Sequence, residues 1–373
     1  MPNYPQPQTR LTFEVAIICA LVEELDAVEA TLDDIYDVDT YSKGEGDPNR
    51  YKGGKILLPG MGKERAASGS AYFCTGFPDI KLCLLVGLCA GAARDHHKED
   101  ILLGDIIIST SLVQSDFGRQ GKDGITRKDT IGDNFGRPSK DIRTLLSMLQ
   151  TQKTGGQSRA NSIAALRVLS QTRQTWHYPG REKDVLFDAK YDHKHHIPGL
   201  CEACDDGHDC EAAQRASCEY LKCDIAKAVE RQTVREDQLP RIHFGAFSSA
   251  DQVIRSSKHR DAMNAADGVI GFKMEGAGVW DNFPTVIIKG VGDYADSHKN
   301  KKFQPYAAAT AAACSKAFLM EWERGRTPRS GQASLPSPSM PTSINNNYAG
   351  GTFNTMGNAF YGGNFTSHGP MNV

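Results

Sequence analysis

The chain has 373 residues, enough for one large α/β domain or two smaller ones. Its charge is nearly balanced, with 43 Lys and Arg against 45 Asp and Glu, so the composition suggests no nucleic-acid or acidic-membrane partner. No stretch approaches the roughly 20 apolar residues of a membrane-spanning helix, and the start, MPNYPQPQTR, lacks the apolar region of a secretory signal. We therefore expect a cytoplasmic protein with the composition of an ordinary enzyme.

Apolar runs alternate with helical stretches along the chain. In the first part we expect strands at 13–19, 82–87 and 104–112, helices at 21–32 and 63–74, and a hairpin-like pair at 51–59. Further on we expect strands at 241–248, 268–274 and 284–290 and helices at 257–265, 275–281 and 306–323. This alternation predicts an α/β fold with three α/β/α layers and a central mixed, mostly parallel sheet.

Three carboxylates follow apolar strands. The run GVIGFKMEGAGVWDNFPTVIIKGVGDYADS places Glu275 after one strand and Asp293 at the end of the next. In EVAIICALVEELDAV, Glu23 and Glu24 lie in the first turn of the helix that follows the first strand. Because ligands bind outside the carboxyl ends of strands in open α/β sheets, we expect one pocket to gather these acids.

The acids occur in order with the segments MGKERAAS (61–68), LVGLCAGAA (85–93) and LLGDIIIST (102–110). Together they resemble the nucleoside phosphorylase-I family, which holds the purine and uridine phosphorylases and the methylthioadenosine/S-adenosylhomocysteine nucleosidases. The chain looks most like the phosphorylase-type domains that open many fungal NLR-like proteins. The resemblance covers roughly residues 12–325, with a poor match from about 150 to 240.

The resemblance implies a role for each acid in cleaving a purine N-ribosidic bond. Asp293 matches the aspartate that protonates or hydrogen-bonds the purine N7. Glu275 matches the carboxylate that binds the ribose 2′-hydroxyl, and Met274 packs against the sugar. Glu24 matches the nucleosidase base that takes a proton from water. Glu23 is its nearest competitor, and both acids alternatively serve only the helix dipole.

Four further residues complete the expected substrate-binding set. Gly62 and Lys63 form a turn entering a helix whose N–H groups can face an anion, or the glycine serves the turn alone. Gly87 lies in LVGLCAGAA, interpreted here as a turn. Arg119 lies just past a strand end where the family contacts substrate, with solvated surface charge as the alternative. Asp296 is interpreted as a cap or ion-pair partner.

Departures from the family favour hydrolysis over phosphorolysis. Phosphorylases of the family clamp phosphate with an Arg and a Ser at the positions of Leu85 and Leu88, and apolar residues cannot replace a bidentate cation. The GDPNR segment (46–50) resembles the family's phosphate loop but follows the first helix, so we interpret it as a turn. Phosphate is then a co-substrate only if the protein is a phosphorylase, and no cofactor is required. A third reading is a nucleotide-sensing module of an immune-like system that binds without turnover.

Ten cysteines fall into two groups. Half of them lie in apolar runs, where a thiol behaves as a small hydrophobe: Cys19, Cys74, Cys83, Cys89 and Cys314. The cluster CEACDDGHDC holds Cys201, Cys204 and Cys210, with Cys218 and Cys223 beyond it and His193, His195 and His196 before it. A CxxC start is typical of zinc sites, but a second CxxC is missing. Structural zinc stays an alternative to reduced surface thiols or a redox pair, and no metal ligand is predicted.

The domain prediction has three parts. Residues 1–11 form a disordered N-terminus, and 12–325 form a nucleoside phosphorylase-like catalytic domain with a polar insertion around 150–240, near the pocket mouth. In the wider polar region 113–240 we expect helical patches at 139–151, 160–170 and 212–230. Residues 326–373 form a low-complexity Gly/Asn/Ser/Pro tail suited to homotypic contacts, with an inert flexible end as the alternative. We expect a homo-oligomer acting on a small purine nucleoside or nucleotide.

Overall fold

The computed structural model describes residues 13–33, 51–52, 56–57, 59–121, 124–130, 133–208, 210–231, 238–299 and 301–325. The predicted disordered N-terminus, the GDPNR turn and the low-complexity tail lie outside the described residues. These three assignments, and with them the division into domains, stay predictions.

Each strand and helix predicted outside the polar middle region has a counterpart in the structure. The first part holds β1 (Val15–Ile18), α1 (Val22–Glu29), β2 (Tyr51–Lys52), β3 (Ile56–Leu57), α2 (Lys63–Gly76), β4 (Leu82–Gly91) and β5 (Ile106–Gln114). The last part holds β8 (Ile242–Ser249), α8 (Ser257–Asp267), β9 (Val269–Lys273), α9 (Gly276–Trp280), β10 (Thr285–Asp293) and α10 (Gln304–Arg324).

The segment 85–93, predicted as a turn, is mostly strand. Strand β4 continues to Gly91, and all ten of its residues are buried. Its outer half pairs with β10 on one side and, at Ala90 and Gly91, with β9 on the other. The turn prediction was wrong because pairing on both sides supplies the hydrogen bonds and burial that keep a glycine-containing run extended.

The main sheet has the order β10-β5-β8-β9-β4-β1-β3-β2, and β10 also pairs with β4. Strands β10, β5, β8, β9 and β4 therefore form a closed ring that β1, β3 and β2 extend. Most pairings are parallel, and the antiparallel ones are β10–β5, β4–β9 and β2–β3. The predicted mixed, mostly parallel sheet is confirmed. Ala90 of β4 has Asp293 and Phe272 as its two strand partners, so the ring brings the ends of β9 and β10 together.

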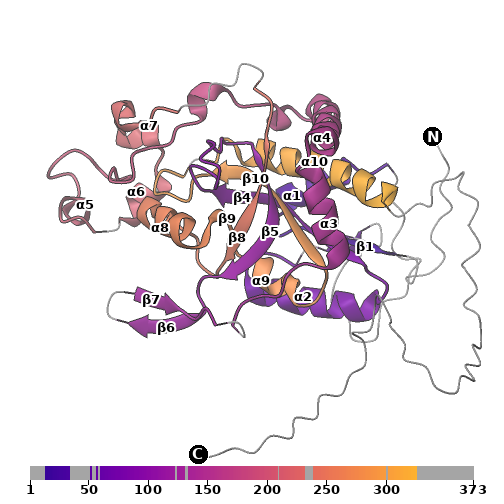
Figure 1. Ribbon diagram of the computed structural model, residues 1–373. Helices are drawn as coiled ribbons and strands as arrows, with labels where there is room; N and C mark the ends of the chain where they lie inside the picture. Colours follow the sequence, from indigo (N-terminus) through magenta and orange to yellow (C-terminus); the bar gives the residue numbers. More distant parts are fainter. Residues whose placement is uncertain are drawn as a thin grey trace, which may run out of the picture. The chain divides into compact units, whose positions relative to one another are not determined.

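Helices cover the sheet on both faces, which confirms the three-layer α/β fold. Figure 1 shows α1, α4 (Gln152–Thr172) and α10 on one side of the sheet and α2 with α9 on the other. Helix α10 is buried along most of its length because its alanines allow close approach to β10, β4 and α4.

The polar middle region contributes more to the core than its composition suggests. It begins with the β6 (Gly118–Gly121) and β7 (Gly124–Arg127) pair, α3 (Lys140–Leu149) and the 21-residue α4. The predicted patch 160–170 is the middle of α4, whose Leu166 and Leu169 join the main core. Beyond it are only short elements: η3 (Gln174–Trp176), η4 (Arg181–Lys183), α5 (Glu202–Asp205), α6 (Glu211–Arg215), α7 (Cys218–Leu221) and η5 (Ile225–Lys227).

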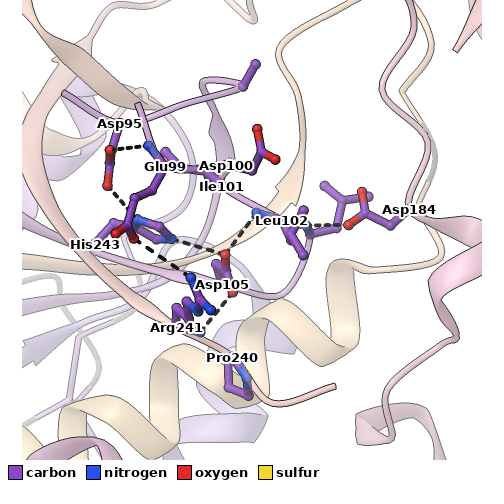
Figure 2. Close-up of polar contacts among 12 residues, drawn as sticks. Asp95, Glu99, Asp100, Ile101, Leu102, Asp105, Asp184, Pro240, Arg241 and His243 are labelled. Atoms are coloured by element: carbon purple, nitrogen blue, oxygen red, sulfur yellow. Dashed lines mark hydrogen bonds and ion pairs between the residues drawn. The ribbon is translucent and has the colours of Figure 1, made fainter. Parts of the chain in front are cut away.

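A buried charged cluster lies where β5 and β8 begin, between Asp105 directly before β5 and His243 of β8 (Figure 2). The ring nitrogens of His243 lie 3.0 Å from Oδ2 of Asp95 and 3.1 Å from Oδ2 of Asp105. Burial by itself lowers the pKa of this imidazole, but the hydrogen bonds and charges of Asp105 and Asp95 outweigh it and raise the pKa to about 9. His243 is therefore charged at neutral pH and links the start of β8 to Asp105 at the start of β5.

None of the helices in the described part of the chain combines the length and apolarity that crossing a membrane requires.

Candidate functional site

A pocket of about 170 Å³ opens where β4, β8, β9 and β10 end. Its walls include Leu88 of β4, Ser248 of β8, Phe272 and Lys273 of β9, and Asp293 of β10, with Met274 directly after β9. A pocket therefore lies at the carboxyl ends of these strands, lined by Met274 and Asp293, but its described lining does not include the other two predicted acids, Glu24 and Glu275.

Glu24 lies behind the pocket wall and is wholly buried, whereas its neighbour Glu23 is exposed. Oε2 of Glu24 accepts hydrogen bonds from the backbone N–H groups of Ala20 (2.7 Å) and Leu21 (3.0 Å). Its Oε1 accepts from the backbone N–H of Leu88 at 2.8 Å. Glu24 thus both caps the first turn of α1 and joins α1 to β4.

Two lysines neutralise Glu24. Nζ of Lys289 lies 3.3 Å from Oε1 of Glu24, and Nζ of Lys273 lies 3.5 Å from the same atom. Burial by itself raises the pKa of Glu24, but the charges of Lys273 and Lys289 and the backbone N–H donors outweigh it and lower the pKa to about 2. Glu24 is therefore ionised at neutral pH.

Glu275 is also wholly buried and shares Lys273 with Glu24. Its Oε2 lies 3.5 Å from Nζ of Lys273, and its Oε1 accepts a 3.4 Å hydrogen bond from the backbone N–H of Gly62. Ser249, the last residue of β8, fixes the turn around Glu275, because its hydroxyl donates to the carbonyl of Met274 and accepts from the N–H of Ala277. Lys273 is thus a pocket residue that contacts two of the three acids.

Asp293 ends β10 in a short turn of its own. Its Oδ1 accepts from the backbone N–H of Ala295 at 2.9 Å and lies 3.1 Å from Nζ of Lys299, which also lines the pocket. Asp296 is buried, caps this turn by accepting from the N–H of His298, and has its pKa raised to about 6 chiefly by burial. The sequence predicted the capping role of Asp296 but not its raised pKa.

Two glycines make this arrangement possible. At Gly87 (φ +144°) a Cβ would lie 2.0 Å from the carboxyl carbon of Glu24, so a side chain there would displace the acid. At Gly278 a Cβ would lie 2.2 Å from the carbonyl oxygen of Lys63, so α9 packs directly on α2. That packing holds Gly62 next to Glu275.

Besides Glu275, Gly62 and Gly87, two more predicted substrate-binding residues are outside the described pocket lining, Lys63 and Arg119. Nζ of Lys63 pairs with Asp116 at 2.6 Å and Asp251 at 3.5 Å. Burial lowers the pKa of Lys63, but these two partners outweigh it and raise the pKa. Arg119 is exposed on β6. Their contact with substrate stays a prediction.

Sequence reasoning missed Lys273 and Lys289. Both lie in largely apolar strands, VIGFK and TVIIKGVGD. Lys289 is wholly buried, and the side chain of Lys273 is 9% exposed. A lysine inside a buried strand requires a buried acidic partner, so this pattern was the available signal.

The structure treats the two sequence groups of cysteines differently. Cys19, Cys83, Cys89 and Cys314 are buried free thiols and Cys74 is half-buried, which confirms their packing role. Four of the cysteines at 201–223 instead lie with histidines in two groups whose ligand atoms could hold a metal ion: Cys201, Cys204 and Cys210 with His195, and Cys223 with His193 and His298.

The family model described as the phosphorylase superfamily matches residues 14–320. The chain belongs to the phosphorylase superfamily. A curated relative of this superfamily member is a nucleotide-binding leucine-rich repeat (NLR)-like protein of Hyaloscypha variabilis, 30% identical over 321 residues. The match covers 82% of the present chain but only 29% of the fungal protein.

Solved structures similar to this phosphorylase-superfamily chain include two from Helicobacter pylori. The 5′-methylthioadenosine/S-adenosyl homocysteine nucleosidase has 13% identity and a TM-score of 0.47, with coverage of 83% of this chain and 98% of that one. The futalosine hydrolase has 13% identity and a TM-score of 0.48, with coverage of 84% and 100%.

Proposed function

We propose that the pocket at the ends of β9 and β10 cleaves the N-ribosidic bond of a purine nucleoside or nucleotide with water. One observation carries the proposal. Asp293 and Lys273 line the pocket, and Lys273 contacts Glu24 and Glu275, two buried acids outside the described lining, so one pocket lysine connects the cavity to both of them.

Each carboxylate has a task in this reaction. The bond between the base nitrogen and the anomeric carbon breaks as a water oxygen bonds to that carbon, and the sugar passes through an oxocarbenium-like state. Asp293 delivers a proton to the departing purine, and Glu275 binds the 2′-hydroxyl. Glu24 orients the water and receives its proton. Phe272 and Met274 supply apolar surface for the base and the sugar.

Apolar side chains on β4 favour water over phosphate as the nucleophile. Leu85 and Leu88 are buried apolar side chains at the positions where phosphorylases of the family clamp phosphate. The pocket lysines, Lys273 and Lys299, are already paired with carboxylates. A phosphate dianion would therefore lack a free cation among the described pocket residues.

A second candidate is a module that binds a nucleotide without turnover. The pKa of about 2 supports it, because a carboxylate held so firmly by two lysines is a weak acceptor of the proton from water. The similarity to an NLR-like protein is compatible with such a sensing role.

One experiment separates these functions. The protein is incubated with a panel of purine nucleosides and nucleotides, with and without phosphate, and the products are separated by chromatography. Free base with ribose supports hydrolysis, and free base with ribose 1-phosphate supports phosphorolysis. Saturable calorimetric binding without free base supports the sensing module and would overturn the enzyme.

A further inference from the structure

The segment from His193 to Cys223 gathers sulfur and imidazole ligands at two points. At the first, the ligand atoms of His195, Cys201, Cys204 and Cys210 all lie within 4.8 Å of one another. Nδ1 of His195 is 3.3 Å from Sγ of Cys204 and 3.8 Å from Sγ of Cys210, and Sγ of Cys201 is 3.8 Å from Sγ of Cys210.

These separations match the edges of a tetrahedral metal site. With zinc–sulfur bonds of about 2.3 Å, two ligand sulfurs of a tetrahedron lie about 3.8 Å apart. A disulfide would bring them to about 2.05 Å. Three cysteines and one histidine form a ligand set typical of structural zinc.

At the second point the ligands come from two parts of the chain. The ligand atoms of His193, Cys223 and His298 all lie within 4.8 Å of one another, with Nδ1 of His193 3.4 Å from Sγ of Cys223. Sγ of Cys218 lies 3.6 Å from the same Nδ1 of His193 and offers a fourth ligand. The other ring nitrogen of His193 lies 3.0 Å from the carbonyl oxygen of Ala216. A carbonyl partner of this kind fixes the tautomer and leaves Nδ1 free as a ligand.

His298 supplies an independent observation. Its imidazole is buried, and neither ring nitrogen has a hydrogen-bond partner among the described residues. Buried polar atoms without partners are rare because their desolvation is uncompensated. A metal bound through one of these nitrogens would supply a missing partner.

The segment also lacks a core able to hold it together. Helices α5, α6 and α7 have only four or five residues each, too few to be stable alone. Their own apolar cluster has three buried members, Cys204, Ala213 and Leu221, separate from the main core. Small units of this kind require cross-links such as metal ions.

We propose that residues 193–223 form a zinc module with two tetrahedral sites. The first is His195, Cys201, Cys204 and Cys210, and the second is His193, Cys218, Cys223 and His298. The second zinc joins the module to the loop after β10, five residues beyond Asp293. The backbone N–H of His193, which donates to the hydroxyl of Ser297 at 3.1 Å, supports the same connection.

The test measures metal content in the full chain purified without chelators. Elemental analysis is expected to give two zinc ions per chain, falling to one in Cys204→Ser and to one in His298→Ala. The control Cys74→Ser, at a half-buried cysteine outside both groups, keeps two. The second site would be overturned if the wild type held one zinc ion per chain, Cys204→Ser removed that ion, and His298→Ala kept it.

A second measurement uses only the wild-type protein, so its result does not depend on whether the variants fold. Wild-type protein exchanged with Co²⁺ should show the intense visible bands and the sulfur-to-metal charge-transfer bands of tetrahedral cobalt thiolates. A wild type without bound metal, or one whose intact mass is lower by two hydrogen atoms for each of two disulfides, would overturn the proposal.

Discussion

Nζ of Lys273 lies 3.5 Å from Oε1 of Glu24, and both side chains are almost wholly buried. This ion pair links the pocket wall to an acid that the pocket lining itself does not include. Removing one partner of a buried ion pair leaves an uncompensated charge, which costs about 3 to 5 kcal/mol. The pair therefore affects both the stability of the fold and the chemistry of Glu24.

Lys273→Met is expected to raise the pKa of Glu24, since it removes one of the two cations that lower it to about 2. The acid limb of the pH dependence of kcat/KM should then move to higher pH, and the free energy of unfolding should fall by about 3 kcal/mol. Lys273→Arg keeps the charge and serves as the control. An unchanged pH profile in Lys273→Met would show that Glu24 takes no part in turnover.

Gly87→Ala should abolish activity and destabilise the protein by about 3 kcal/mol, because its Cβ overlaps the Glu24 carboxyl and its φ of +144° is strained for any other residue. Gly136→Ala is the matched control, since a Cβ there meets nothing within 4 Å. Urea denaturation of both variants tests this packing. Equal midpoints would contradict it.

His243 predicts a loss of stability at alkaline pH. Its folded pKa of about 9 lies above the ordinary value of 6.5, so its contribution is complete below pH 6.5 and disappears as pH rises through 9. The change amounts to about 3 kcal/mol of unfolding free energy, measurable by urea denaturation across this range. The exposed control His259→Gln should keep the full pH dependence, and His243→Gln should lose most of it.

The strands and their acids were predictable because the relevant signals are local. Apolar runs mark β9 and β10, and each acid follows its strand directly, so the structure places Glu275 and Asp293 at the predicted strand ends. Glu24, the acid that Lys273 and Lys289 share, was not predictable as their partner, because α1 supplies it from a distant part of the chain. The outer half of β4 was missed for a similar reason, since its pairing with β9 and β10 depends on closure of the ring.

The proposed contact between Glu275 and the 2′-hydroxyl predicts a preference among substrates. Loss of a hydrogen bond to a charged group costs about 1.5 to 3 kcal/mol, so 2′-deoxyadenosine should be cleaved roughly tenfold to a hundredfold more slowly than adenosine. Glu275→Gln should cleave adenosine and 2′-deoxyadenosine at more similar rates than the wild type does. Equal kcat/KM values for the two nucleosides in the wild type would remove Glu275 from this role.

The most direct measurement is the rate of free-base release by Asp293→Asn beside the wild type, followed by chromatography with a purine nucleoside that the wild type cleaves. The amide cannot deliver a proton to the leaving purine, so the rate should fall by roughly 10² to 10⁴. The urea denaturation midpoint of Asp293→Asn should stay close to that of the wild type. The exposed control Asp281→Asn should keep both the wild-type rate of base release and the wild-type midpoint. Base release by Asp293→Asn at the wild-type rate, or no free base from the wild type with any purine nucleoside or nucleotide, would contradict the proposed N-ribosidic bond cleavage.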